Sequence, residues 1–175
     1  MGADMALHAF DTLFEAGRSL GLKLGGMHMM DAARSEKAYR HFGHDITCED
    51  HVLEAGLGFA VSLKKPAFIG RDAVLRKKDQ GLDKRLVQFL AQDPEAMFYH
   101  NEPILRDGKI VGHLSSGAYG HWLGGAVGLG YVPCKGETPQ ALLASQWSID
   151  VAGRRVPVTA SLKPLYDPDS SRIRA

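Results

Sequence analysis

The second half of the sequence is a series of short runs of alternating or β-branched residues separated by turn signals, which predicts strands. Asp107-Gly108 and Ala152-Gly153 are typical of hairpin turns, and Gly124-Gly125 and Pro133 separate other runs. About six strands at this spacing predict a small antiparallel barrel or sandwich. The runs are residues 85–90, 104–105, 109–116, 126–132, 147–151 and 154–160.

The first half shows helical periodicity instead. Apolar residues at three- and four-residue spacing predict an amphipathic helix over residues 4–20. A second helix is expected from Asp31 to about Phe42, followed by a strand over residues 57–63 and a third helix over residues 71–78. In the second helix, charged side chains are expected on the solvent-facing side: Arg34, Glu36, Lys37 and Arg40.

Composition limits the possible partners. A chain of 175 residues can form one ordinary domain or one and a half small ones, and its 45% of hydrophobic residues are enough to fill a core. A net charge of +1 gives no excess of cations for nucleic acid or an anionic membrane. Cys48 and Cys134 lie far apart, which favours free thiols in a reducing compartment. No apolar run approaches the roughly 20 residues of a spanning helix. We expect a soluble protein of the cytoplasm or an organelle matrix.

Two patterns that could carry chemistry are incomplete. The glycine-rich residues 117–130 lack the strand and helix of a dinucleotide site and the lysine of a phosphate loop, so their glycines are expected to serve strand bends and close approach. The second pattern holds metal-ligand residue types but matches no closed zinc motif, which favours ordinary loop residues. We therefore expect no metal site and no complete catalytic set. The residues of this second pattern are His41, His44, Cys48 and His51, with His28 nearby.

Three ordered blocks resemble the aminomethyltransferase family, the T-protein of the glycine cleavage system. They run from Arg34 to Asp45, from Leu53 to Val61 and from Phe68 to Asp72. They are more similar still to the family's relatives fused to flavin oxidases, the dimethylglycine and sarcosine dehydrogenases. Residues 112–133, 155–158 and 163–164 resemble the C-terminal barrel of the same family.

The resemblance implies an α+β fold in which the end of a split α/β folate-binding domain precedes a small antiparallel Greek-key β-barrel. The expected boundaries are residues 1–82 for the truncated first domain, residues 83–167 for the barrel and residues 168–175 for an extended tail. Such a fold places tetrahydrofolate in a central cavity, which positions its amine nitrogens against an electrophilic carbon and excludes water.

The implied function is that of a fragment of a tetrahydrofolate-dependent one-carbon transfer enzyme. T-proteins take a methylene unit from an aminomethyl-lipoyl carrier and release ammonia, whereas the dehydrogenase relatives pass an iminium or formaldehyde made at a flavin to folate. The expected partner is a small-molecule folate, and FAD is expected only in an upstream domain. An upstream aspartate and glutamate of the family would fall before Asp4, so no catalytic residue is expected here and the fragment alone should be inactive.

Two residues are expected to contact folate. Tyr39 matches an aromatic that borders folate in some family members, with packing as the alternative. Arg172 matches a terminal arginine that would pair with the glutamyl carboxylate. The family's arginine before the second helix is replaced by Met30, which favours the alternative of a non-catalytic folate-binding or protein-docking module. Exposed apolar residues on the first helix suggest a homodimer of the fragment.

Overall fold

The computed structural model describes residues 2–174 and divides into two compact units, one ending at Met30 and one beginning at Asp31. The first unit holds a 3₁₀ turn, η1 (Ala3–Met5), and helix α1 (Ala6–Arg18). The helix expected over residues 4–20 is therefore confirmed, although it is shorter at both ends. None of its side chains is buried within the described chain.

Helix α2 (Met27–Glu36) begins and ends earlier than expected, so the prediction of a helix from Asp31 to Phe42 is wrong at both ends. Ala38 has a φ of +54°, the left-handed conformation in which an α-helix stops. The Tyr39 N–H donates to the Arg34 carbonyl at 2.8 Å and the Ala38 N–H to the Ser35 carbonyl at 3.0 Å. These two bonds are the Schellman motif that closes a helix, here with alanine where glycine is usual.

The strand expected over residues 57–63 is also wrong. The segment instead forms a short 3₁₀ turn, η2 (Gly58–Ala60). It follows Gly56, whose φ of +71° turns the chain away from an extended path. Helix α3 (Arg71–Gln80) confirms the helix expected at 71–78 and lies between Gly70 and Gly81, both with positive φ.

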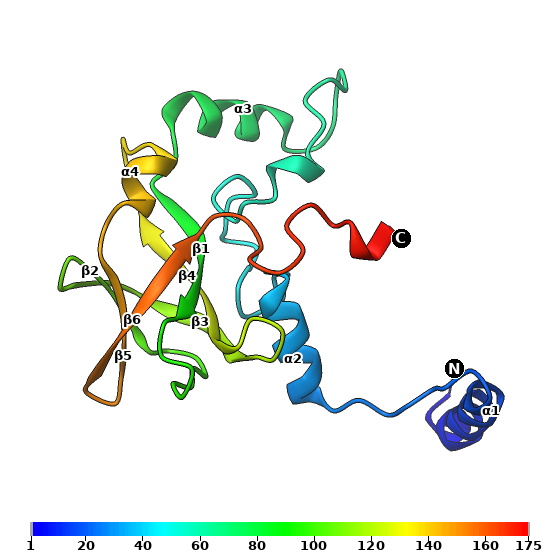
Figure 1. The fold of residues 1–175 in the computed structure, drawn as a ribbon. Coiled ribbons are helices and arrows are strands. Elements are labelled where there is room, and N and C mark those ends of the chain that lie inside the picture. Colours follow the sequence, from blue (N-terminus) through cyan, green and yellow to red (C-terminus); the bar gives the residue numbers. More distant parts are fainter. Residues whose placement is uncertain (1, 175) are drawn as a thin grey trace. The chain divides into compact units, whose positions relative to one another are not determined.

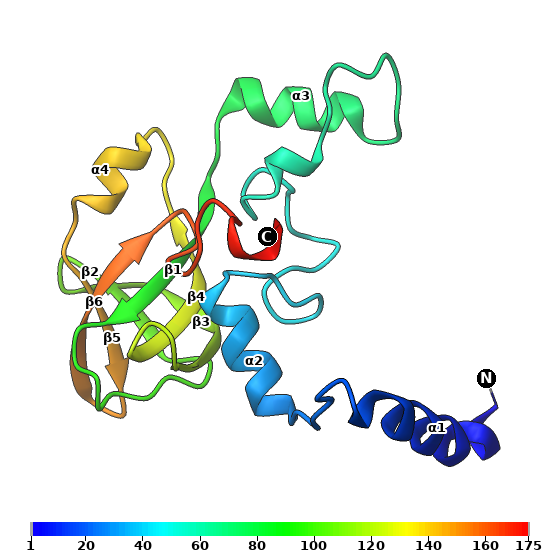
Figure 2. The ribbon, with the colours of Figure 1, turned by 45° about the vertical axis from the view of Figure 1, so that its right-hand side comes forward.

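Six antiparallel strands then form a closed barrel, which Figures 1 and 2 show from two directions. Its strand order is β1-β4-β3-β2-β5-β6. The hairpin-connected β2, β3 and β4 have β1 beside them, which is a Greek key, and the β5–β6 hairpin completes the ring. The expected α+β fold with its Greek-key barrel is thus confirmed. The strands are β1 (Lys84–Ala91), β2 (Pro103–Arg106), β3 (Lys109–Gly120), β4 (Gly125–Pro133), β5 (Trp147–Val151) and β6 (Arg154–Ser161).

Two of the expected turn pairs form two-residue hairpins. Asp107-Gly108 joins β2 to β3, where Arg106 pairs with Lys109, and Ala152-Gly153 joins β5 to β6, where Val151 pairs with Arg154. All four turn residues have positive φ, which matches the right-handed twist of the strands.

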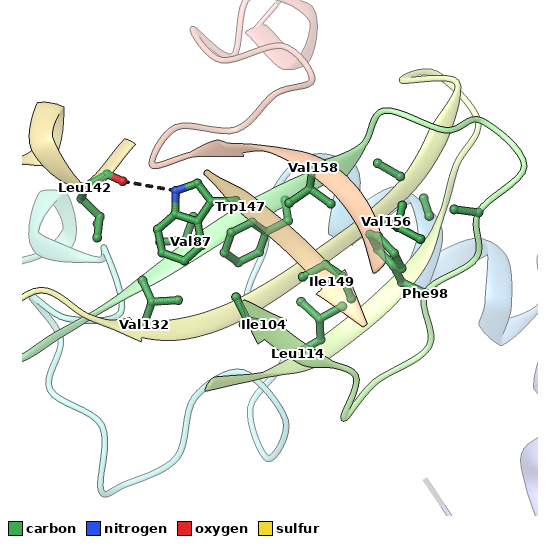
Figure 3. Packing of buried hydrophobic residues seen from close by; sticks show 14 of the residues in the cluster. Val87, Phe98, Ile104, Leu114, Val132, Leu142, Trp147, Ile149, Val156 and Val158 are labelled. Atoms are coloured by element: carbon green, nitrogen blue, oxygen red, sulfur yellow. Dashed lines mark hydrogen bonds between the residues drawn. The ribbon is translucent and has the colours of Figure 1, made fainter. Parts of the chain in front are cut away.

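The barrel interior is a continuous apolar core (Figure 3). Phe89 is fully buried, with its ring centroid 5.5 Å from that of Trp147. The Trp147 indole N–H donates at 3.2 Å to the Leu142 carbonyl of helix α4 (Pro139–Leu143), which satisfies the one polar group of that side chain. The expected close approach at glycines also occurs, because a Cβ on Gly117 would lie 2.6 Å from the Tyr99 carbonyl oxygen.

After β6 the chain returns toward the C-terminal end of α2 (Figures 1 and 2). We call residues 162–174 the C-terminal segment; they end in a 3₁₀ turn, η3 (Arg172–Arg174). The two compact units divide between residues 30 and 31 rather than near residue 82, so the expected domain boundaries stay predictions. Within residues 2–174, no helix is both long and apolar enough to cross a bilayer.

Candidate functional site

A cleft of 680 Å³ lies where three stretches of the second unit meet. Its lining comes from residues 37–40 after α2, from residues 46–59, and from the C-terminal segment. The C-terminal segment is more than 100 residues from the other two in sequence, so the cleft depends on the tertiary fold.

The lining of this cleft is cationic. It contains Lys37, Arg40, Lys163 and Arg174, and no Asp or Glu of residues 2–174 lines it. The Arg40 guanidinium is fixed by hydrogen bonds from Nε to the Ala55 carbonyl at 2.9 Å and from Nη1 to the Ala38 carbonyl at 2.8 Å. Burial lowers the pKa of Arg40 from its usual value, but an arginine stays protonated at neutral pH. The described residues give neither Lys163 nor Arg174 an ion-pair partner.

The same cleft has apolar and aromatic walls. Tyr39 is 50% exposed, Phe59 is exposed, and Ile46, Leu57 and Leu162 are half-buried at its margin. A flat apolar body with an anionic end would therefore find both a surface to stack on and cations to pair with.

Glu36 is buried rather than solvent-facing, so this expectation from the sequence is wrong. Its Oε1 accepts hydrogen bonds from the backbone N–H groups of Trp122 at 2.7 Å and Leu123 at 3.1 Å, in the turn between β3 and β4. Gln88 of β1 donates through Nε2 to the Ser35 carbonyl at 2.7 Å and the Glu36 carbonyl at 3.0 Å. The end of α2 is thus fixed to two parts of the barrel.

Lys37 is buried as well, which corrects the same expectation. Its Nζ donates to the Asp167 carbonyl, to Asp167 Oδ2 at 3.0 Å and to Ser170 Oγ at 3.1 Å. The Lys37 and Asp167 side chains are only 8% and 4% exposed. Burial works against the charged form of Asp167, but hydrogen bonds from Lys37, Arg172 and Ser171 outweigh it and lower the pKa of Asp167.

A second buried network holds the loop after α2 against the barrel. Asp45 Oδ2 accepts from Arg34 Nη1 at 2.7 Å and from the His41 N–H at 2.9 Å, while Oδ1 accepts from Ser115 Oγ at 2.5 Å. Arg34 Nη2 also donates to Ser116 Oγ at 2.9 Å. The hydrogen bonds of Arg34 and Asp45 thus connect α2, the loop after it and strand β3.

Glu54 fixes the entry to β1. Its Oε1 accepts from the Asp83 N–H at 3.0 Å and lies 2.8 Å from Lys77 Nζ. Burial again opposes ionisation, and the hydrogen bonds from Lys77 and Asp83 prevail, so the pKa of Glu54 is lowered.

The two residues expected to contact folate lie in different places. Tyr39 lines the cleft. Arg172 does not line it; its guanidinium carbon lies 5.2 Å from the Trp122 ring centroid and 5.6 Å from that of Tyr166, and its Nη1 donates to the Tyr166 hydroxyl at 3.2 Å. Arg174, two residues further on, does line the cleft. Both roles stay predictions.

Sequence reasoning missed the four cleft cations. Lys37, Arg40 and Lys163 fell within the stretches that carry the family resemblance, which was the one available signal. Nothing local marked Lys37, because its partner is 130 residues away. A buried ion pair of this kind is visible only once the chain is folded.

The histidine-rich stretch was the other candidate from the sequence. The rings of His41 and His44 stack with centroids 4.5 Å apart. Across the described residues 2–174, the structure gathers no three His, Cys, Asp or Glu side chains in a metal-binding arrangement. Cys48 is exposed and Cys134 buried, and both are free thiols.

Comparison with known proteins identifies both parts of the chain. The glycine cleavage T-protein C-terminal barrel domain matches residues 84–167, and the GCVT N-terminal domain matches residues 1–65. The aminomethyltransferase T of the glycine cleavage system from Bartonella henselae has the same fold, with a TM-score of 0.77 and 22% identity over 94% of this chain and 45% of that one.

Two relatives are similar over nearly the whole chain. The 4-methylaminobutanoate oxidase (formaldehyde-forming) of Paenarthrobacter nicotinovorans is 43% identical over 98% of this chain. The human mitochondrial dimethylglycine dehydrogenase is 32% identical over 94% of it. The chain spans only 20% and 19% of the length of these relatives. It belongs to the aminomethyltransferase family, that of the glycine cleavage T-protein.

Proposed function

We propose that the chain supplies the folate-holding part of a tetrahydrofolate-dependent one-carbon transfer enzyme, of the dimethylglycine or sarcosine dehydrogenase type or of the T-protein type. The observation that supports this most is the cleft, which combines cations with aromatic walls and has no acidic side chain among its described lining residues. Its volume of 680 Å³ falls within the roughly 300–1,000 Å³ usual for small-molecule sites.

The residues of the cleft fit a folate. A folate has a flat aromatic body and carboxylates at one end. Lys163 and Arg174 would pair with the carboxylates, and Tyr39 and Phe59 would pack against the aromatic body. When bound, tetrahydrofolate supplies the amine nitrogens that accept the one-carbon unit.

This chain's own contribution is binding and orientation. No carboxylate lines the cleft in the part of the chain that the structure describes, so the proposal takes the acidic groups from elsewhere in a longer protein. The same holds for FAD, which the proposal assigns to another domain. A walled site raises the rate of transfer by holding the acceptor nitrogens in place and keeping water away.

Calorimetry on the full chain with (6S)-5-formyltetrahydrofolate tests the proposal. We expect saturable binding that Tyr39→Ala weakens about tenfold, or about 1.4 kcal/mol. Tyr99→Ala is the matched control, because Tyr99 is also exposed but lies outside the cleft. Absence of binding to the unaltered chain would refute the proposal. Comparing Arg172→Ala with Arg174→Ala decides which terminal arginine pairs with the carboxylate.

The second candidate is a non-catalytic folate-binding or protein-docking module. Two observations favour it: the described residues place no acidic side chain in the cleft, and Met30 stands where the family pattern has arginine. Experiments on the longer protein that the proposal implies distinguish the enzyme from the non-catalytic module. Folate binding with turnover of a methylated amine supports the enzyme, binding without turnover supports a folate-binding module, and no binding heat supports a docking module.

A further inference from the structure

The C-terminal segment forms one wall of the cleft although it contains almost no regular structure. Lys163, Pro168 and Arg174 all face the cleft from this segment. Asp167 and Ser170 have positive φ, at +46° and +54°, conformations that side-chain-bearing residues adopt only when other contacts hold them. Polar contacts with other parts of the chain must therefore hold this wall in place.

The main anchor is Lys37. An ammonium group has three hydrogens to donate, and Lys37 donates all three to the C-terminal segment: one to the Asp167 carbonyl, one to Asp167 Oδ2 and one to Ser170 Oγ. The pair is almost completely shielded from water. A shielded ammonium without its partner is strongly unfavourable, so Lys37 and this segment are held together.

Asp167 links this anchor to the end of the chain. While Oδ2 pairs with Lys37, Oδ1 accepts from the Ser171 N–H at 2.9 Å, from Ser171 Oγ at 3.0 Å and from the Arg172 N–H at 3.3 Å. One carboxylate thus fixes both the position of the segment and the turn that carries Arg174. Closer to β6 the segment has separate anchors, since the Leu165 N–H donates to Gln88 Oε1 at 2.8 Å.

We propose that the Lys37–Asp167 pair is a clasp that positions the C-terminal segment as a wall of the cleft, so that closing the clasp and binding the ligand favour each other. Lys37 lines the cleft, yet its hydrogens are committed to the clasp, so it is a positioning residue rather than a ligand cation. The cations left for a ligand are Arg40, Lys163 and Arg174, and the clasp sets the place of the last. The identity of the ligand as a folate rests on the proposed function.

The clasp is tested first without ligand, by hydrogen exchange read by mass spectrometry on the full chain. In Lys37→Met and Asp167→Asn we expect the amides of Tyr166, Ser171 and Arg172 to exchange at least about tenfold faster, with β3 and β4 unchanged. Lys37→Arg should restore much of the protection. Glu137→Gln is the control, because it weakens the Arg106–Glu137 ion pair, which lies outside the cleft. Unchanged exchange of the segment in both variants would overturn the clasp.

Coupling to the ligand is tested in the same proteins with (6S)-5-formyltetrahydrofolate. We expect Asp167→Asn to weaken binding about tenfold and bound folate to slow exchange of the segment in the unaltered chain, because coupling is reciprocal. Equal affinities in the unaltered chain, Asp167→Asn and Glu137→Gln would overturn the coupling and leave the proposed function intact. No binding to the unaltered chain would overturn the proposed function and the coupling, while exchange still decides the clasp. If Lys37→Met does not fold, the near-isosteric Asp167→Asn decides.

Discussion

The barrel and the cleft region beside it are held together by different forces. In the barrel every strand pairs on both sides and the interior is filled by apolar side chains. In the cleft region, made of residues 31–60 and the C-terminal segment, Ala38 packs on Leu86 and Leu129 of the barrel, but four of the buried residues are charged: Glu36, Lys37, Asp45 and Glu54. Apolar packing is non-directional and scales with the area buried, whereas charge-assisted hydrogen bonds fix positions.

This difference suggests a division of roles. The barrel supplies stability and a rigid surface, and the buried charges hold irregular segments at defined places on that surface. Each of the following substitutions is expected to affect one of these two regions, the barrel or the cleft region, more than the other.

The largest effect is expected from Phe89→Ala. Phe89 is fully buried against Trp147, so the change opens a cavity and should lower the free energy of unfolding by about 4 kcal/mol. Urea denaturation followed by circular dichroism measures this. Ile69→Ala is the control, because Ile69 is fully exposed. A loss below about 1 kcal/mol would mean that the barrel core is not the main source of stability.

Asp45→Ala should come next, at about 3 kcal/mol, because it leaves Arg34 without its buried partner and the His41 N–H without its acceptor. Hydrogen exchange should show faster opening of residues 37–57 than of the barrel strands. Asp79→Ala is the matched control, since Asp79 is exposed on α3. Equal opening in both regions would argue that the two are one cooperative unit.

Glu54→Gln should cost about 1 kcal/mol at neutral pH, because the amide oxygen can still accept from Asp83 but the charge facing Lys77 is lost. The pKa of Glu54 is lowered in the fold. Its stabilising contribution is therefore complete above the unfolded pKa of about 4.3 and is lost as the pH falls through the lower folded value. Thermal unfolding between neutral and acid pH should show a smaller pH dependence in Glu54→Gln than in the unaltered chain. An identical dependence would contradict this.

The smallest effect is expected from Trp122→Ala. Trp122 is 69% exposed, and its contacts are with Tyr166 and Arg172 at the surface, so the free energy of unfolding should change by less than about 0.5 kcal/mol. Trp147→Ala, which empties a buried position, should cost several times more. A large loss at Trp122 would show that this surface cluster anchors the C-terminal segment.

Local patterns in the sequence were enough to predict the strands, and the family resemblance favoured a barrel over a sandwich. The alternation of residues along β6 indicates which face is buried, and the Asp107-Gly108 and Ala152-Gly153 pairs adopt the positive φ that their hairpins require. Both signals depend on residues that are close together in the sequence, so they can be recognised without the structure. The same is true of α3, which lies between two glycines.

The sequence alone was enough to predict six strands, two of their hairpins and the family resemblance. The folded structure was needed to show that α2 ends at Glu36, that residues 57–63 form no strand, and that Glu36 and Lys37 are buried. The cause is distance along the chain. A charged side chain is predicted to be solvent-exposed unless its partner is known. The partner groups are the Trp122 and Leu123 N–H groups for Glu36, and Asp167 for Lys37. The cleft exists because those distant contacts form.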